Sequence, residues 1–311
     1  MKTFIQVTEI WTPSEDGSLL EFHSGLYGPH KAFGGITRMM CFGFDEGLPG
    51  KAWAERHPIV LKDLQNSYFR RGEAAAKAGL TCGVAIPLFD GETLKAVLVF
   101  FCGDDSEHVG AIEVWHNDPA KDIELGLADG YYGRAESFEV VSKRTRFQKG
   151  YGLPGLVWET GLPVVMADLG MSQRFLRRDE AKRVGINKGL GLPVGSVPGH
   201  QYIMAFLSAL GTPIARRFEV WAATPEGDAL SFHSGDCDSV PDFAAGMAGV
   251  RIAAGAGPIG QAMATKTPVL LGNFAEAEGP LAGAAQAGLG ALVAIPIIDG
   301  GLTRAVACLY F

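Results

Sequence analysis

The chain of 311 residues has few cysteines, no long apolar run and no excess of positive charge. Its five cysteines are an odd number and include no Cys-x-x-Cys pair, which argues against a disulfide framework and against a zinc site. No apolar run approaches the roughly 18 residues that a membrane-spanning helix needs, which excludes a membrane protein of that kind. The N-terminus shows neither the apolar segment nor the cleavage site of a signal peptide, so we expect a cytoplasmic protein.

Charge and composition exclude two further classes. The sequence has 27 lysines and arginines against 34 aspartates and glutamates, and this net charge of −7 gives no general attraction to phosphate backbones. We therefore expect no nucleic-acid partner. Hydrophobic residues make up 47% of the chain and charged residues 20%, which rules out a disordered chain and indicates a globular protein with an ample core.

The sequence repeats itself three times. Trp11, Trp115 and Trp221 each end a strand-like run that reads Glu-Ile-Trp or Glu-Val-Trp, at a spacing of about 105 residues. Turn glycines, phenylalanines and prolines follow the same register: Gly25, Gly130 and Gly235; Phe33, Phe138 and Phe243; Gly47, Gly152 and Gly257; Gly79, Gly185 and Gly288; Pro87, Pro193 and Pro296. Each unit is long enough for its own core, so we expect three domains, at residues 1–104, 105–210 and 211–311.

Periodicity and turn residues predict the order of elements within a repeat. In the first repeat they predict strands at 4–11, 19–23, 37–44 and 58–61, helices at 47–56 and 67–79, and a closing hairpin of strands at 82–88 and 94–102. This order predicts an α+β fold, a mainly antiparallel sheet with helices packed on it. Residues 150–155 and 255–260 spell G-x-G-x-x-G, but the flanking strands lie too close for a dinucleotide-binding crossover. We interpret both as tight turns.

These elements resemble the GAF domain family of small-molecule-binding sensor modules. In the first repeat the resemblance rests on the glycine turn at 47–50, the strand from Pro58 to Asp63, Gly79, and the run from Val84 to Leu88. The equivalent segments recur in the other two repeats. The resemblance implies three tandem GAF-like domains that hold a ligand between sheet and helix. The long flanking helices, the output domain and the cyclic-nucleotide and bilin motifs of other family members are missing.

Candidate ligand-binding residues follow from that expected position. Arginines follow a phenylalanine on the predicted helix of the first two repeats, where a guanidinium can clamp a carboxylate or phosphate. The alternative is a solvated helix face with an apolar anchor. An aspartate after the preceding strand either contacts the ligand or caps the next turn. The candidates are Asp63, Phe69, Arg70 and Arg71 in repeat 1 and Asp168, Phe175, Arg177 and Arg178 in repeat 2. Repeat 3 has few basic residues, so we expect it to be ligand-poor and an anionic ligand to favour the first two.

No catalytic set has a spacing that the repeats support. We find no Ser/His/Asp set, paired carboxylates or metal-ligand cluster, and therefore predict no catalytic residue, no metal and no cofactor. The hypothesis is a non-enzymatic GAF-like sensory or regulatory protein of signal transduction that binds a small molecule in at least one repeat. One alternative is a GAF-like scaffold or assembly subunit with no small ligand. A weaker alternative is a cysteine-based free methionine sulfoxide reductase, although Cys82 lies close to Pro87 and has no equivalent in the other repeats. We expect Cys41, Cys82, Cys102 and Cys308 to be packing residues in apolar strands.

The last strand of each repeat is apolar on both faces. In the first repeat Leu98 and Phe100 alternate with Val99 and Phe101. Such a strand belongs to a sheet that is covered on both sides, and the helices of the repeat cover only one. We therefore expect three similar lobes, with this second face buried against a neighbouring repeat or a second chain. We predict self-association as a homo-oligomer, or another protein partner; the alternative is that packing between the repeats buries the whole face.

Overall fold

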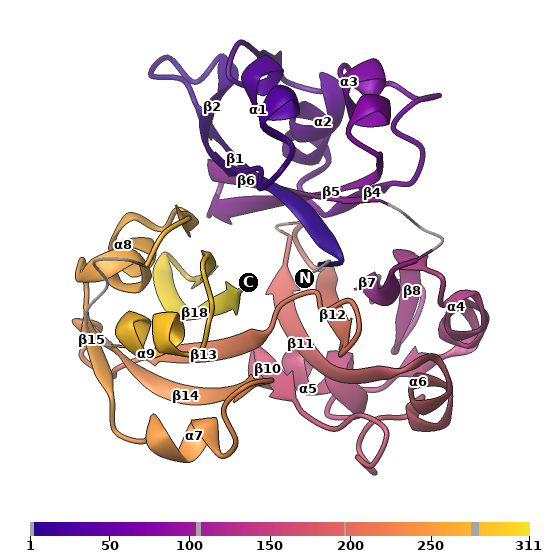
Figure 1. Cartoon of the computed structure of the whole chain (residues 1–311), viewed down its shortest axis with the longest axis vertical. Coiled ribbons are helices and arrows are strands. Elements are labelled where there is room, and N and C mark those ends of the chain that lie inside the picture. The colour runs from indigo at the N-terminus through magenta and orange to yellow at the C-terminus, as the bar shows by residue number, and fades with distance from the viewer. Residues whose placement is uncertain (1–2, 104–106, 196, 275–279) are drawn as a thin grey trace.

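The computed structural model describes residues 3–103, 107–195, 197–274 and 280–311. The chain forms three lobes around a common centre, and both termini lie near that centre (Figure 1). Each lobe is one six-stranded antiparallel sheet with helices on its outer side. The predicted α+β fold of three tandem domains is confirmed.

The first lobe shows the strand order that the other two repeat. Its sheet has the order β3-β2-β1-β6-β5-β4. The strands are β1 (Ile5–Pro13), β2 (Leu19–Leu26), β3 (Cys41–Gly43), β4 (Ile59–Leu61), β5 (Leu80–Asp90) and β6 (Thr93–Gly103). The helices are α1 (Lys31–Thr37), α2 (Gly47–Glu55) and α3 (Gly72–Lys77).

The second and third lobes have the same connectivity. The second consists of β7 (Val109–Asn117), β8 (Leu125–Gly133), α4 (Glu136–Arg144), β9 (Arg146–Phe147), α5 (Gly152–Thr160), β10 (Val164–Met166), α6 (Arg178–Val184), β11 (Ile186–Val194) and β12 (Gln201–Ala209). The third consists of β13 (Arg217–Ala223), β14 (Ala229–Cys237), α7 (Phe243–Gly246), β15 (Arg251–Ala253), α8 (Gly257–Thr265), β16 (Val269–Leu271), α9 (Pro280–Gln286), β17 (Leu292–Asp299) and β18 (Leu302–Tyr310). Their sheet orders are those of the first lobe.

Two of the predicted elements differ from the structure. The predicted strand at 37–44 is only β3, because Thr37 ends the unpredicted helix α1 and a turn at 38–40 follows it. Gly34 and Gly35 lie inside α1, and because glycine has a low helix propensity, the sequence did not indicate a helix there. The predicted helix at 67–79 is only α3, and the residues before it form a turn.

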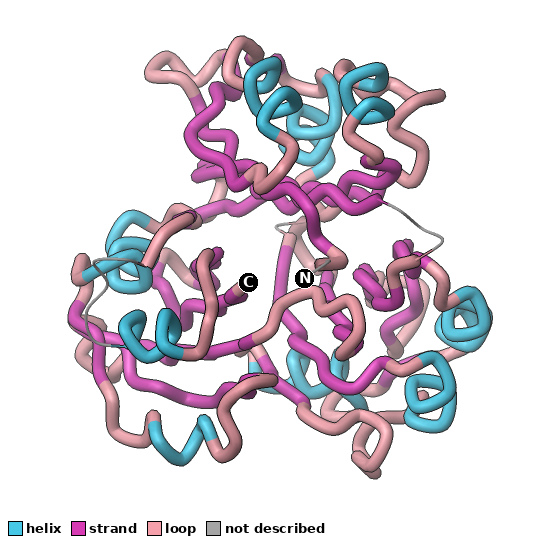
Figure 2. The backbone as a smooth tube through the Cα atoms, in the orientation of Figure 1, coloured by secondary structure: helices cyan, strands magenta, loops and turns pink. Residues whose placement is uncertain are grey.

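The lobes close into a ring with an approximate threefold axis. The fourth strand of each repeat packs against the second strand of the next, as β4 on β8, β10 on β14 and β16 on β2. The fifth strands β5, β11 and β17 contact one another at the centre. Figure 2 shows the strands toward the middle and the helices outside.

The inner faces of the three sheets form one shared core. Leu98 and Phe100 of β6, Phe206 of β12, and Ala307 and Leu309 of β18 belong to the same buried cluster. The opposite face of each sheet carries its own core under the helices. The predicted packing of the second sheet face against neighbouring repeats is confirmed. Because the inner sheet faces are buried within one chain, their apolar character is not evidence for self-association. The homo-oligomer stays a prediction.

Candidate functional site

A buried ion pair occupies the space between helix and sheet in the first lobe. Arg71 donates from Nη1 to Oε1 of Glu9 at 2.7 Å and from Nη2 to Oε2 at 2.9 Å, and both side chains are at most 1% exposed. Trp11 Nε1 and Tyr27 Oη donate to the same carboxylate at 3.1 and 3.2 Å, and Thr37 Oγ1 hydrogen-bonds to both ions. Burial and the neighbouring Glu9 charge raise the pKa of Tyr27 well above its usual value, so its hydroxyl stays a donor.

The second lobe repeats this arrangement. Arg177 binds both oxygens of Glu113, and its Nη2 lies 2.8 Å from Oε2. Trp115 and Tyr132 each donate to the carboxylate at 3.0 Å, and Ser142 takes the place of the threonine. Burial, and then the charge of Glu113, also raise the pKa of Tyr132.

The third lobe keeps the glutamate but draws its cation from another element. Arg217 lies on β13, two residues before Glu219, and contacts it at 3.4 Å. Tyr310 and Trp221 donate to Glu219 at 2.8 and 2.9 Å. Burial raises the pKa of Glu219. Cys237 occupies the position in repeat 3 that Tyr132 has in repeat 2. Burial opposes ionisation of its thiol, but hydrogen bonds with Arg217 and Ser239 bring the pKa of the thiol below its ordinary value.

The predicted arginines divide into buried and exposed ones. Arg71 and Arg177 are the cations of the buried pairs, whereas Arg70 pairs at the surface with Glu46 and Arg178 lies 3.6 Å from Asp179. All but Arg178 precede their helices instead of lying on them. Their role in ligand binding stays a prediction.

The remaining candidates pack or form turns. Phe69 and Phe175 are buried against the faces of the two buried guanidiniums, with the arginine carbon 5.1 and 5.3 Å from the ring centres. Asp63 accepts from the backbone N–H groups of the next turn, which lowers its pKa. Asp168 has φ of +50° and its carbonyl accepts from Met171 N at 3.0 Å. The Asp63 carboxylate thus caps the next turn, whereas Asp168 takes part in its turn through its backbone; a role of either in ligand binding stays a prediction.

Three buried glutamates were not among the residues predicted from the sequence. Glu9, Glu113 and Glu219 stand two residues before the repeated tryptophans, so the repeated Glu-Ile-Trp and Glu-Val-Trp motifs already contained the signal. The prediction for Cys41 was wrong, since it is exposed on the edge strand β3, while the other four cysteines are buried.

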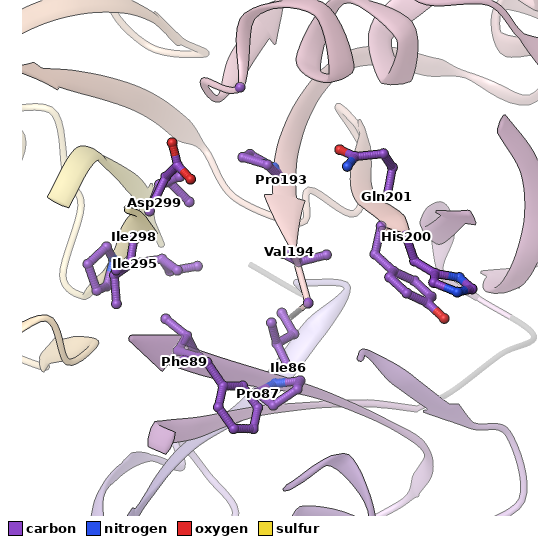
Figure 3. Close-up of a pocket in the computed structure, with 16 residues that line it drawn as sticks. Ile86, Pro87, Phe89, Pro193, Val194, His200, Gln201, Ile295, Ile298 and Asp299 are labelled. Carbon is purple, nitrogen blue, oxygen red and sulfur yellow. The ribbon is translucent and has the colours of Figure 1, made fainter. Parts of the chain in front are cut away.

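A cavity of about 290 Å³ lies where the three repeats meet. Ile86 and Pro87 of β5, Pro193 of β11, and Ile295 and Pro296 of β17 supply apolar walls from each lobe. Polar side chains also line it: His200, Gln201, Tyr202 and Asp299. Figure 3 shows the apolar side chains converging from three strands, with Asp299 on one side and Gln201 and His200 on the other. We call this space the axial cavity.

Aromatic rings join repeats 1 and 2 beside the axial cavity. His57 of repeat 1 stacks on Tyr202 with ring centres 4.8 Å apart, and His116 stacks on Tyr202 at 4.3 Å. His116 Nε2 lies 2.8 Å from Nδ1 of His200, so one nitrogen donates and the other accepts. Burial and the charge of His200 lower the pKa of His116.

The described residues contain neither a membrane-spanning helix nor a cluster of metal ligands. In these ranges no helix is long and apolar enough to cross a membrane. The same residues contain no group of three or more His, Cys, Asp or Glu side chains placed to hold a metal ion.

Comparison with known families gives one match. Residues 6–115 match the family model described as the GAF domain. The match covers the first repeat and reaches into the first strand of the second, so the first repeat is similar to a GAF domain. The second and third repeats share the sheet order of the first, so all three are GAF-like. A search of curated proteins found no match.

A search of solved structures found matches that each cover about a third of this chain. The GAF domain of nlh2 from A. aeolicus in an inactive state is 19% identical over 32% of this chain and 58% of that one, with a TM-score of 0.26. NreA from Staphylococcus aureus, mutated in its nitrate binding site, is 16% identical over 32% and 74%, with a TM-score of 0.27. Free methionine-R-sulfoxide reductase from Neisseria meningitidis, in complex with its substrate, is 19% identical over 33% and 53%, with a TM-score of 0.25. Likeness at this level carries no argument about function.

Proposed function

We propose that this protein is a non-enzymatic GAF-like regulatory protein that binds a small molecule in the axial cavity. The observation that carries the proposal is the lining of this cavity, because all three repeats contribute to it and it combines apolar walls with a few polar side chains. That combination is typical of small-molecule sites.

The interiors of the lobes favour this location over the one that the family resemblance implies. Between helix and sheet, Arg71 and Arg177 are already neutralised by Glu9 and Glu113 and enclosed by aromatic rings. Displacing either carboxylate in favour of an anionic ligand would leave a buried charge without a partner. An anion in the first two lobes remains a prediction that rests on the exposed Arg70 and on Arg178.

A ligand at this place can couple the three lobes. It would contact the fifth strand of every repeat, so binding favours the closed ring over any arrangement in which a lobe has moved away. A ligand that binds only the closed ring stabilises it by about 2.7 kcal/mol at a hundred times its dissociation constant. Because binding alone would change the stability of the closed ring, a sensory role requires no catalysed reaction at the site.

The test is a thermal-shift screen of the intact chain against a metabolite library, followed by native mass spectrometry of the hits. Gln201 is exposed at the cavity wall, so Gln201→Trp is expected to fill the cavity and abolish the shift. Glu21→Trp, also on an exposed strand position but outside the cavity, is the matched control and is expected to keep it. Hits that are equally strong in both variants would contradict the axial site.

A scaffold without a small ligand is the second candidate, and the filled interiors of the lobes favour it. A screen with no saturable hit, together with copurification of a defined protein partner, would support it. A reductase has less support, because Cys82 is completely buried in the shared core. The cytoplasmic location stays a prediction.

A further inference from the structure

The three repeats place the same kind of residue at the end of their second helix. Arg56, Gly161 and Lys266 follow α2, α5 and α8, and all three adopt the left-handed conformation, with φ of 59°, 66° and 56°. In two of the three repeats this position therefore carries a long basic side chain. In repeat 2 it carries none.

Each of these positions faces the hairpin turn of the next repeat around the ring. Lys266 of repeat 3 places Nζ 2.6 Å from Oδ2 of Asp90, the last residue of β5 in repeat 1. The same ammonium donates to the carbonyl of Gly301 at 2.6 Å. The backbone of Arg56 in repeat 1 lies close to Gly195, in the turn after β11 of repeat 2. Its guanidinium, however, pairs with Glu92 and donates to the Gly91 carbonyl in its own repeat. The ion pair across a junction at this position is therefore the one between Lys266 and Asp90.

The third junction has the acid but lacks the base. Asp299 is the last residue of β17 and the repeat equivalent of Asp90. The helix end that faces it is Gly161, which has no side chain, and both residues line the axial cavity. No cationic side chain among the described residues pairs with the Asp299 carboxylate. The cavity therefore lies where the geometry of the junction between repeats 3 and 1 would place a lysine side chain.

We propose that the axial cavity binds a primary alkylammonium ion, whose charged head takes the place that Lys266 Nζ has at the Asp90 junction. This inference rests on the proposed function and names its ligand class. The ammonium pairs with Asp299, and the alkyl chain lies on the apolar walls formed by Pro193 and Ile295. Asp299 is exposed at the edge of the cavity, next to these apolar walls, so the site attracts a cation with an apolar stem and repels an anion.

The probe is n-butylammonium, which matches the side chain of lysine. Isothermal titration of the intact chain is expected to show one saturable site for n-butylammonium chloride and none for sodium butyrate or butan-1-ol. Asp299→Asn is expected to weaken binding about tenfold or more, because it removes a charge-assisted pair. Asp90→Asn removes the equivalent acid at the occupied junction and is the matched control, which keeps the affinity.

Two substitutions at Gly161 separate the missing charge from strain in the backbone. Gly161→Lys supplies the missing side chain in a conformation that Lys266 already adopts, and is expected to abolish binding and raise the unfolding temperature. Gly161→Ala carries the same backbone strain without the cation and is expected to keep binding. The converse change, Lys266→Gly, opens a second cavity of the same kind, so the variant is expected to bind two equivalents.

The outcomes distinguish this inference from the proposed function. No saturable binding of n-butylammonium, or binding that survives both Asp299→Asn and Gly161→Lys, overturns the alkylammonium site. If a library compound of another class binds and Gln201→Trp abolishes its binding, the proposed function stands and the ligand class is wrong. If nothing binds to the intact chain, both fail.

Discussion

Arg70 and Arg71 are neighbours with opposite environments, which makes them a matched pair for testing the buried ion pair. Arg71→Met keeps most of the side-chain volume but leaves Glu9 fully buried and without its cation. It also removes two charge-assisted hydrogen bonds, at 2.7 and 2.9 Å. Breaking a buried pair from one side typically costs about 3–5 kcal/mol, and we expect that loss here. Arg70→Met breaks a surface pair with Glu46 and is expected to cost less than about 1 kcal/mol.

The assay is urea unfolding followed by tryptophan fluorescence, since Trp11 donates directly to the carboxylate in question. The double variant Glu9→Gln with Arg71→Met removes both charges and is expected to recover a large part of the loss, because no uncompensated ion remains. Equal free energies of unfolding for the two single variants would refute the reasoning. So would a double variant that is no more stable than Arg71→Met alone.

Three further predictions concern the junctions and the thiols. Lys188 is 1% exposed and pairs with two aspartates of repeat 3, so Lys188→Met is expected to lower the free energy of unfolding by about 3 kcal/mol in urea titrations, and an unchanged midpoint would contradict this. The lowered pKa of His116 means that the folded chain binds fewer protons there than the unfolded chain, so its stabilising contribution is complete above about pH 6.5 and is lost as the pH falls. His116→Phe should therefore reduce the loss of stability between pH 7 and pH 5, which urea unfolding midpoints measured at both pH values will show. The aromatic and titratable groups that surround His116 are Tyr202, His200, His57, Asp118 and Lys121. Cys41 should be the one thiol of the described cysteines that reacts rapidly with a maleimide in the native protein, as intact mass spectrometry will show; two or more fast labels would contradict the burial of the others.

Much of the fold was predictable because it depends on short-range signals. Turn glycines such as Gly47 and Gly79 need a positive φ, here 58° and 70°, so they mark the same places in every repeat. The two-sided apolar pattern of β6 predicted that the second face of the sheet is buried, since alternation along a strand shows both faces at once. The α1 helix escaped prediction because its glycines obscured the periodicity.

The site depends on long-range pairing, and the sequence showed it only in part. Glu9 and Arg71 are far apart in the chain, and nothing local indicates that they meet. The first two repeats keep both partners in register, whereas Arg217 moves the cation from the loop to the strand. Comparing the repeats for identical residues at equivalent positions finds the glutamate, which recurs in all three. It overlooks the arginine, which stands at another position in the third repeat. For the same reason an arginine near a helix was interpreted as a possible ligand clamp when its partner was already in the chain.

Three covalently joined repeats permit an asymmetry that three identical subunits would not. In a symmetric trimer a glycine at the helix end would remove the cation from all three junctions at once. In this chain Gly161 removes it from one junction, while Lys266 still joins repeats 3 and 1 through Asp90. The ring therefore keeps the Lys266–Asp90 pair and has a glycine beside the axial cavity where repeats 2 and 3 meet. A ligand that fills the cavity would complete the ring, and its concentration would then set how firmly the second and third repeats are joined.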